Sequence, residues 1–522
     1  MRSRNQIIMM IALIVALGGL LMGFDASVIS GVVKFIEPEF GLTKLELGWS
    51  VASLTLTATF AMMVSGPLSD RVGRRTVLRY AAMLYAISAV GSAIAPNFLF
   101  LVIARMIGGF GVGASLILAP MYIAEMAPPD MRGRLVSFNQ LNIVIGISLA
   151  FFTNYLILQL GKSDAAWAIN LKFDEHNWRW MLGLEAVPAV LYFAGLFFVP
   201  MSPRWLILKG RFDEATTVLA RYSSKSEADQ TISDIRDSIE TEKDKEKINW
   251  SELFKPAMRL VLSIGIVVAI LQQITGINSV FFYAPMIFEQ SGIGTDASFV
   301  QAILVGVTNL VFTILALLLI DRLGRKPLLT GGVVGMAVCL MLLAYGFHSA
   351  TYSLTPEALT SLPETIDQAV LQPISGVTYS NDIEFNKALE SMFSAEQISA
   401  HKSDLVKAAI TMNPMLILFG ILGFVASFAI SIGPVMWVLF SELFPNKIRG
   451  VAISFVGLIN SAVSFLVQWI FPWELETLGN SWTFFIYGIF AILGLIFIVR
   501  VIPETKGKSL EELEEQLVPS QN

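Results

Sequence analysis

Residues 66–75 read Gly66-Pro67-Leu68-Ser69-Asp70-Arg71-Val72-Gly73-Arg74-Arg75, and residues 321–326 repeat the end of this stretch as Asp321-Arg322-Leu323-Gly324-Arg325-Lys326. Each copy follows an apolar stretch long enough to cross a bilayer, and its glycine tolerates the positive φ of a tight turn. Two further signatures recur in the same order. They are residues 125–133 against 442–450, and residues 200–204 against 503–507. Three signatures that each occur twice, in the same order, indicate that the chain contains an internal duplication.

The composition of the 522 residues is that of a membrane protein. Apolar residues make up 55% and charged residues 15%, where soluble domains have about 45–50% and about 25%. A net charge of −5 and this high apolar content exclude a disordered chain, a collagen-like chain and a basic nucleic-acid-binding protein. We therefore expect a lipid bilayer around the protein and no nucleic acid as partner.

Hydropathy predicts an all-α membrane protein with twelve transmembrane helices. Each apolar stretch is near or above the roughly 20 residues that a helix needs to cross about 30 Å of hydrocarbon. The ten-residue alternating patterns of a transmembrane β-barrel are absent from the sequence. The predicted spans are 7–30, 47–68, 77–95, 98–121, 136–160, 179–199, 260–287, 298–320, 327–347, 411–440, 451–472 and 482–502.

Lysine and arginine gather in alternate connections, which predicts the orientation of the spans. The enriched side includes Arg2 and Arg4 near the N-terminus and Lys506 and Lys508 near the C-terminus. We therefore expect a multi-pass protein of the plasma membrane, the inner membrane of a bacterial cell, with both termini in the cytoplasm. The first apolar run is too long for the core of a signal peptide, so we expect it to be retained as a span.

The repeat divides the chain into two pseudo-symmetric six-helix bundles. The predicted parts are an N-terminal bundle (1–200), a cytoplasmic helical linker (201–259), a C-terminal bundle (260–505) with an extracellular insertion (351–409), and a cytoplasmic tail (506–522). Bundles related in this way form a substrate site between them near the midplane and expose it to either side by rocking. We expect the protein to act as a monomer.

Enzyme chemistry finds little support in the sequence. Cys339 is the only cysteine and the three histidines are scattered, so we expect no metal site and no cofactor. Gly161-Lys162-Ser163 resembles the end of a phosphate loop, but Leu156 stands where the first glycine should be. We therefore expect no catalytic residues.

The repeated turns place arginines near the carboxylates of the second signature, Glu125 and Glu442. Pairs between them would hold the cytoplasmic side closed in one state and separate in the other. The alternative is that these arginines only enforce the positive-inside topology. The predicted gating set in these loops is Asp70, Arg71, Arg75, Glu125, Arg132, Asp321, Arg322, Arg325, Glu442 and Arg449.

With these signatures, the sequence resembles the sugar porter family of the major facilitator superfamily, near its bacterial proton-coupled xylose and hexose transporters. The resemblance also rests on Gln272-Gln273-Ile274-Thr275-Gly276-Ile277-Asn278 and on Gly433-Pro434-Val435-Met436-Trp437. It covers nearly the whole chain except the insertion 351–409. It implies the major facilitator fold and alternating-access transport of a monosaccharide or a similar polyol.

A sugar site needs amides, which both donate and accept hydrogen bonds, and an aromatic platform, whereas charges are costly at the midplane. Gln272, Gln273 and Asn278 meet this need in one span, and Trp437 offers a stacking face. The resemblance adds Gln140, Asn309 and Asn460 to the predicted substrate site. For any one of these residues the alternative is a bond between neighbouring helices.

Three further positions bear on how closely the chain follows the family's pattern. Tyr283 resembles the outer gate of the family, although an apolar stripe at helical spacing also serves packing. Asn460 is followed by Ser461 where the family commonly has a tryptophan, so the resemblance cannot name the sugar. Met201 replaces the glutamate of the family's exit motif, which weakens one cytoplasmic charge network.

Asp25 lies in the middle of the first span, where a lone charge costs about 2.5–3.5 kcal/mol. Arg105 is the natural partner, because it is the only basic residue within the fourth span. The resemblance favours sugar:proton symport, since its proton-coupled members carry aspartate here. We predict that protonation of Asp25 frees Arg105 and permits closure, the alternative being a static ion pair. A facilitative uniporter for a sugar or inositol and a non-transporting sugar receptor remain as alternatives.

Overall fold

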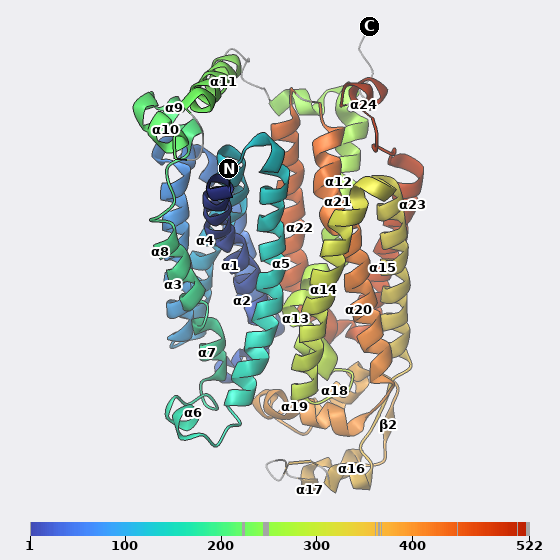
Figure 1. The fold of residues 1–522 in the computed structure, drawn as a ribbon. Helices are drawn as coiled ribbons and strands as arrows, with labels where there is room; N and C mark the ends of the chain where they lie inside the picture. The colour runs from blue at the N-terminus through green and yellow to red at the C-terminus, as the bar shows by residue number, and fades with distance from the viewer. Residues whose placement is uncertain are drawn as a thin grey trace. The chain divides into compact units, whose positions relative to one another are not determined.

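The computed structural model describes residues 2–221, 225–243, 250–360, 362–363, 366, 368–445, 447–508 and 510–517. Residues 222–224 and 244–249 of the predicted linker, and residues 509 and 518–522 of the predicted tail, lie outside the described residues. The chain forms two compact units, each made of several stretches of the sequence; Figure 1 shows the ribbon coloured by residue number. Unit 1 comprises Met1–Ser27, Ser53–Ala150 and Arg179–Asn249, and unit 2 comprises Val28–Ala52, Phe151–Trp178 and Trp250–Asn522.

Long apolar helices dominate both units and confirm the all-α fold class. The helices of the first half are α1 (Arg2–Phe40), α2 (Lys44–Val72), α3 (Arg74–Ala93), α4 (Phe98–Met126), α5 (Pro129–Leu160), α6 (Ala166–Asn170), α7 (Asn177–Gly183), α8 (Ala186–Gly195), α9 (Pro203–Leu208), α10 (Phe212–Leu219) and α11 (Lys225–Lys243). In the described part of the chain, eleven helical segments are long and apolar enough to cross a membrane.

The sixth predicted span, residues 179–199, is broken and therefore differs from our expectation of one continuous helix. Two short helices, α7 and α8, replace it, with a turn at Leu184 and Glu185 between them. Pro188 explains the break, because it cannot donate a backbone hydrogen bond to the carbonyl of Leu184 and its ring clashes with that carbonyl. The span is thus divided into segments too short to count separately as membrane-crossing helices.

Small residues on α4 let the helices of unit 1 approach closely. A Cβ atom on Gly109 would lie 2.4 Å from the carbonyl oxygen of Leu54 on α2, and one on Gly113 would lie 2.1 Å from that of Ala58. The close packing brings polar side chains of neighbouring helices into the same interior. Helices α9, α10 and α11 lie together at one end of the unit 1 helices (Figure 1).

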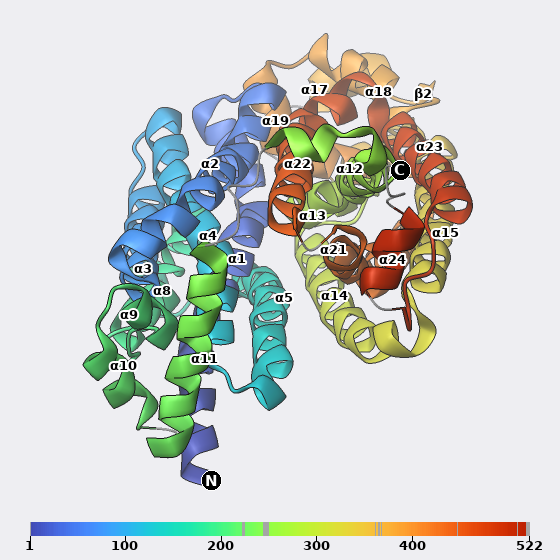
Figure 2. The ribbon, with the colours of Figure 1, turned by 90° about the horizontal axis from the view of Figure 1, so that it is seen from above.

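Unit 2 contains the helices of the second half and the short η segments between them. These elements are η1 (Trp250–Phe254), η2 (Pro256–Met258), α12 (Arg259–Ile274), α13 (Ile277–Glu289), α14 (Thr295–Leu323), α15 (Arg325–His348), α20 (Pro414–Ile430), α21 (Ile432–Leu443), α22 (Arg449–Thr477), α23 (Gly479–Val501) and α24 (Leu510–Leu517). In the end-on view of Figure 2, α24 lies against the end of α21.

The insertion between α15 and α20 is a small folded layer with its own core. Its elements are β1 (Thr351–Ser353), α16 (Pro356–Thr360), α17 (Gln368–Leu371), η3 (Gln372–Ile374), β2 (Thr378–Tyr379), α18 (Asp382–Glu390), α19 (Ala395–Ala409) and β3 (Ile410–Thr411). The strands form an antiparallel sheet in the order β2-β1-β3, with Tyr352 opposite both Tyr379 and Ile410. Tyr352 stacks on Phe385 with ring centroids 5.4 Å apart. The insertion is therefore a packed structure, where the sequence predicted only a loop.

The C-terminal end of α1 and the N-terminal end of α2 belong to unit 2. Lys34 forms an ion pair with Glu289 at 2.6 Å. The indole of Trp469 on α22 donates a hydrogen bond to the carbonyl oxygen of Leu45 at 3.2 Å. A Cβ atom on Gly48 would lie only 1.9 Å from the carbonyl oxygen of Trp469, so only glycine permits this approach. These contacts fix both ends on α13 and α22.

Candidate functional site

Two helix breaks in unit 2 bring backbone and amide groups together. Gly276 has φ +84° between α12 and α13, so the amides of Gln272 and Gln273 end one helix and that of Asn278 begins the next. A second break occurs at Ser431, between α20 and α21, with φ −124° and ψ −105°. Breaks of this kind at the midplane are typical of transporter binding sites. The structure thus gives a local reason why the predicted amides converge.

The predicted amides form one hydrogen-bonded network. Gln273 Nε2 donates to Gln272 Oε1 at 3.1 Å and to Asn460 Oδ1 at 3.2 Å. Asn460 Nδ2 donates to Gln272 Oε1 at 2.7 Å, and Asn278 Nδ2 donates to Gln273 Oε1 at 2.8 Å. We call Gln272, Gln273, Asn278 and Asn460 the amide network. No member carries a charge, so the network is polar without the cost of an ion buried among apolar helices.

Helix α22 contributes two more polar residues that the sequence analysis missed. Ser464 Oγ accepts from Asn278 Nδ2 at 2.7 Å and from Gln468 Nε2 at 2.7 Å. Both residues are buried, and with Asn460 they stand four residues apart on one face of α22. This spacing was the available signal. Ser464 and Gln468 continue the polar face of α22 beyond Asn460, toward the C-terminal end of that helix.

Tyr283 lies at a kink of α13 and contacts the same helix. Its backbone has φ −126° and ψ 16°, and Pro285 follows two residues later. The hydroxyl of Tyr283 donates to the carbonyl oxygen of Gln468 at 3.0 Å, and its ring is tilted against Phe471 at 5.3 Å. The predicted gate residue is therefore buried and bound to α22 in this structure.

The other predicted substrate residues do not join the network by hydrogen bonds among the described residues. Asn309 is buried on α14. Trp437 on α21 meets Phe440 edge to face at 6.0 Å between ring centroids. The residue is 48% exposed, so part of its surface remains accessible. Gln140 is exposed on α5 and belongs to unit 1, whereas its neighbour Asn139 is buried.

Asp25 and Arg105 are paired inside unit 1, which agrees with the proximity that the sequence suggested. Asp25 Oδ1 lies 3.5 Å from Arg105 Nη1, and the side chain of each is 2% exposed. Asp25 Oδ2 has no hydrogen-bond partner among the described residues, and a Cβ atom on Gly108 would approach it to 2.8 Å. Glu185, at the break of the sixth span, is buried as well. Asp25, Arg105 and Glu185 are therefore all buried in this unit.

The repeated turn of the first half holds an ion-pair network. Arg74 Nη1 lies 2.7 Å from Asp70 Oδ1, and Arg74 Nε lies 3.1 Å from Glu125 Oε1. The other oxygen of Glu125 accepts from the hydroxyl of Ser202. We call Asp70, Arg74, Glu125 and Ser202 the first turn network. All four residues belong to unit 1.

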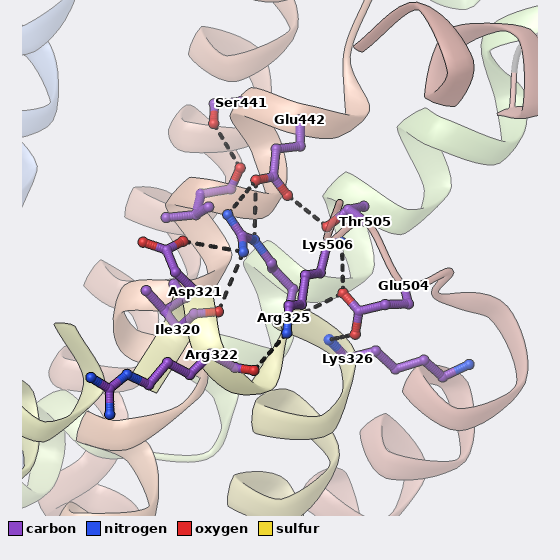
Figure 3. A network of polar contacts seen from close by, with 11 residues as sticks. Ile320, Asp321, Arg322, Arg325, Lys326, Ser441, Glu442, Glu504, Thr505 and Lys506 are labelled. Carbon is purple, nitrogen blue, oxygen red and sulfur yellow. Dashed lines mark hydrogen bonds and ion pairs between the residues drawn. The ribbon is translucent and has the colours of Figure 1, made fainter. Parts of the chain in front are cut away.

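The turn of the second half repeats this arrangement in unit 2 (Figure 3). Arg325 Nη1 lies 3.3 Å from Asp321 Oδ1, and Arg325 Nη2 lies 2.7 Å from Glu442 Oε1. The other oxygen of Glu442 accepts from Thr505 Oγ1 at 2.6 Å. We call Asp321, Arg325, Glu442 and Thr505 the second turn network. The repeat of the sequence is thus a repeat of contacts.

Glu504 adds a carboxylate to the second turn that the first turn lacks. Its oxygens accept from the backbone N–H groups of Arg325 and Lys326, both at 3.1 Å, and of Lys506 at 2.8 Å. Partial burial raises the pKa of Glu504, but these hydrogen bonds outweigh it, so the pKa lies below its ordinary value. In the first turn, the side chains facing Gly73 are those of Met201 and Trp205.

The structure brings together only part of the predicted gating set. Arg74 carries the ion pairs of the first turn, where we predicted Arg71 and Arg75. Arg71 is exposed, and Arg75 donates to the carbonyl oxygen of Val199 at 3.0 Å. In the second turn Arg325 makes the predicted contact, whereas Arg322 is exposed.

The arginines of the second signature lie outside the turn networks. Arg132 is exposed, and Arg449 Nε donates to the carbonyl oxygen of Phe444 at 3.0 Å. The latter bond holds the end of α21 near the start of α22. Glu442 is instead contacted by Arg325 and Thr505.

Comparisons with known proteins agree with this geometry. The family model described as "Sugar (and other) transporter" matches residues 11–358 and 395–517, so it skips part of the insertion. The arabinose-proton symporter of Bacillus subtilis is 35% identical over 511 residues, which cover 97% of this chain and 94% of that protein. The D-xylose-proton symporter of Escherichia coli K12 is 35% identical over 546 residues, covering 98% and 96%.

Solved structures give the same result. The inward open conformation of the xylose transporter XylE from E. coli superposes with a TM-score of 0.74 at 33% identity and covers 98% of this chain and 100% of that one. A partially occluded inward open conformation of the same transporter gives 0.71. The twelve-span organisation predicted from hydropathy and repeats therefore corresponds to a known architecture. The chain belongs to the sugar transporter family and has the major facilitator fold.

Proposed function

We propose that this protein carries a pentose or a hexose across the plasma membrane together with a proton, by alternating access. The observation that carries the proposal is the amide network, an uncharged cluster where two membrane helices break. Such a cluster suits a neutral ligand with many hydroxyl groups, since amides can both donate and accept hydrogen bonds. The symporter relatives support the same class of substrate.

The direct test is uptake by purified protein in proteoliposomes. D-xylose, L-arabinose and D-glucose, each radiolabelled, are offered with and without an inward pH gradient. We expect at least one sugar to accumulate above its outside concentration, and a protonophore to abolish this accumulation. Uptake that equilibrates but never accumulates would indicate the facilitative uniporter instead, and no uptake of any sugar or of inositol would overturn the proposal.

The proposed substrate residues are Gln140, Gln272, Gln273, Asn278, Asn309, Trp437 and Asn460, with Tyr283 as a gate. Gln273→Ala is the most informative change, because Gln273 is bonded to three other network residues. We expect it to weaken sugar binding at least tenfold. Gln301→Ala on α14, outside the network, serves as the matched control and should bind as the wild type does.

The proposed proton-coupling pair is Asp25 and Arg105. A buried carboxylate next to one arginine can exist as an ion pair or, once protonated, as a neutral acid that releases the arginine. Asp25→Asn should abolish accumulation against a gradient while sugar exchange across the membrane continues. Unchanged uphill uptake by this variant would show that the proton binds elsewhere.

The remaining predictions belong to the same proposal. We propose that the protein is a monomer with both termini in the cytoplasm. Its bundles span residues 1–200 and 260–505, joined by the cytoplasmic linker 201–259. We also propose that the two turn networks stabilise the cytoplasmic ends of the helices and take part in gating.

A further inference from the structure

The hydrogen-bond directions within the amide network are fixed by backbone carbonyl groups, which can only accept. Gln272 Nε2 faces the carbonyl oxygens of Ile432 at 3.4 Å and Gly433 at 3.2 Å. Asn460 Nδ2 faces the carbonyl oxygen of Ala269 at 2.9 Å. These two side chains must therefore turn their N–H groups toward the carbonyls.

The directions of the other amides follow from these two. Because Gln272 Oε1 and Asn460 Oδ1 point inward as acceptors, Gln273 must offer its Nε2 to them. Gln273 Oε1 then accepts from Asn278 Nδ2. The second N–H of Asn278 goes to Ser464 Oγ. Each of the four amide nitrogens thus has at least two acceptors among the described residues, enough for its two N–H groups; Asn460 Nδ2 also lies 3.8 Å from Met436 Sδ.

The amide oxygens of the network can still accept hydrogen bonds, whereas its amide N–H groups are already used. Asn278 is only partly buried, and its Oδ1 accepts no hydrogen bond among the described residues. An unpartnered oxygen that was fully buried would be one of the buried, unpartnered polar atoms of the described residues. Asn278 Oδ1 is not one of them, so solvent reaches it. Gln273 Oε1 has one further lone pair beside its bond from Asn278. The four amides therefore offer acceptors to a ligand, and none of their N–H groups is left to donate among the described residues.

We propose that the amide network binds its substrate as an acceptor surface, so that substrate hydroxyls donate to Asn278 Oδ1 and Gln273 Oε1, and that Ser464 is the positioning residue that enforces this polarity. Ser464 does so by occupying the second N–H of Asn278. The inference rests on the proposed sugar-binding function and adds a rule of specificity to it. A group that accepts but cannot donate gains nothing from this surface.

The test measures equilibrium binding of D-xylose to the purified full-length protein by calorimetry. At each ring position the hydroxyl is replaced in turn by hydrogen or by fluorine, which accepts weakly but cannot donate. We expect at least one position where the fluoro analogue loses about tenfold in affinity, as much as the deoxy analogue does. Fluoro analogues that bind like D-xylose at every position would overturn the inference.

A variant tests the positioning role of Ser464. Ser464→Ala frees one N–H of Asn278, so the fluoro analogue should regain at least threefold in affinity relative to the deoxy analogue. Ser454→Ala on the same helix, whose hydroxyl donates to the carbonyl oxygen of Gly450 at 2.8 Å, is the matched control and should leave this ratio unchanged. Equal ratios in both variants would overturn the role of Ser464.

Failure of the inference can be told from failure of the proposed function. Binding of D-xylose, L-arabinose or D-glucose to the wild type preserves the proposed function, whatever the analogues do. If none of the three parent sugars binds, the proposed function is overturned and the inference with it. The wild-type analogue series needs no variant, so the inference can be refuted even if Ser464→Ala fails to fold.

Discussion

The first and second turn networks have the same skeleton and differ in one partner. In each, an arginine joins an aspartate on the preceding helix to a glutamate, and a hydroxyl group holds the second oxygen of that glutamate. The second turn also has Glu504, bound to three backbone N–H groups, where the first has Met201 against Gly73. The comparison teaches that the arginine–glutamate pair is the shared element. The extra carboxylate is an addition to one copy.

Burial also differs between the two networks. The side chains of Arg74 and Glu125 are 7% and 8% exposed, whereas those of Arg325 and Glu442 are 13% and 19% exposed. An ion pair that is less exposed loses more when one partner is removed, because the remaining charge cannot be solvated. The two copies should therefore respond unequally to the same change.

Removal of the shared arginine should have the largest effect. We expect Arg74→Ala to lower stability by about 3–5 kcal/mol, because it leaves the carboxylate of Glu125 buried without its cation. Arg325→Ala should cost less. Thermal unfolding of the purified protein in detergent measures both. Arg71→Ala, at an exposed neighbour, is the control and should stay within about 0.5 kcal/mol of the wild type; a loss equal to that of Arg74→Ala would refute the assignment.

The hydroxyl groups should separate the two copies further. Ser202 donates to Glu125 and also caps α9 by accepting from the N–H of Trp205, whereas Thr505 donates to Glu442. Ser202→Ala should therefore cost about 2–3 kcal/mol and Thr505→Val about 1–2 kcal/mol. The same unfolding measurement decides the order. A larger loss for Thr505→Val would contradict the capping argument.

Exchange of the differing residue should have a smaller effect. Glu504→Met leaves three backbone N–H groups without their carboxylate, and we expect a loss of about 1 kcal/mol. Met201→Glu places a carboxylate near the N-terminus of α3, and we expect a gain below about 1 kcal/mol. Unfolding of the single variants and of the double exchange tests whether the two turns are interchangeable. A neutral Glu504→Met would show that they are.

The pH dependence should give the smallest difference. Because the pKa of Glu504 in the folded protein lies below its ordinary value of 4.5, its stabilisation is complete above about pH 4.5. It is lost as the pH falls through the lower folded value. The difference in melting temperature between the wild type and Glu504→Gln should therefore be constant from pH 7 to 5 and shrink below pH 4.5. A difference that grows on acidification would contradict the sign.

Much of this fold could be predicted because membrane helices and repeats leave strong signals. The spans could be predicted from the apolar stretches, because hydropathy depends on local composition. The duplication could be predicted because the same short signatures occur twice in the same order. The sixth span was harder, because a single proline, Pro188, breaks a helix without changing its hydropathy. The insertion was missed as a folded layer, because its strands have only two or three residues each.

The candidate site could be predicted less completely. Gln272, Gln273 and Asn278 were identified because they stand in one short segment. Ser464 and Gln468 were missed because a serine and a glutamine in a membrane helix are individually unremarkable. The choice of Arg74 over Arg71 depends on where the turn at Gly73 aims each side chain, and sequence spacing alone cannot decide it.

The helix break at Gly276, between α12 and α13, has a consequence for how this chain can evolve. A side chain there would meet the ring of Tyr487 at 2.4 Å, and that ring is held by a hydrogen bond to Glu474 and by stacking on Phe471. The positive φ already disfavours every other residue type. No single substitution relieves both constraints, so mutational drift is blocked at this position. If the proposed function holds, we expect changes in sugar preference to arise at residues other than Gly276.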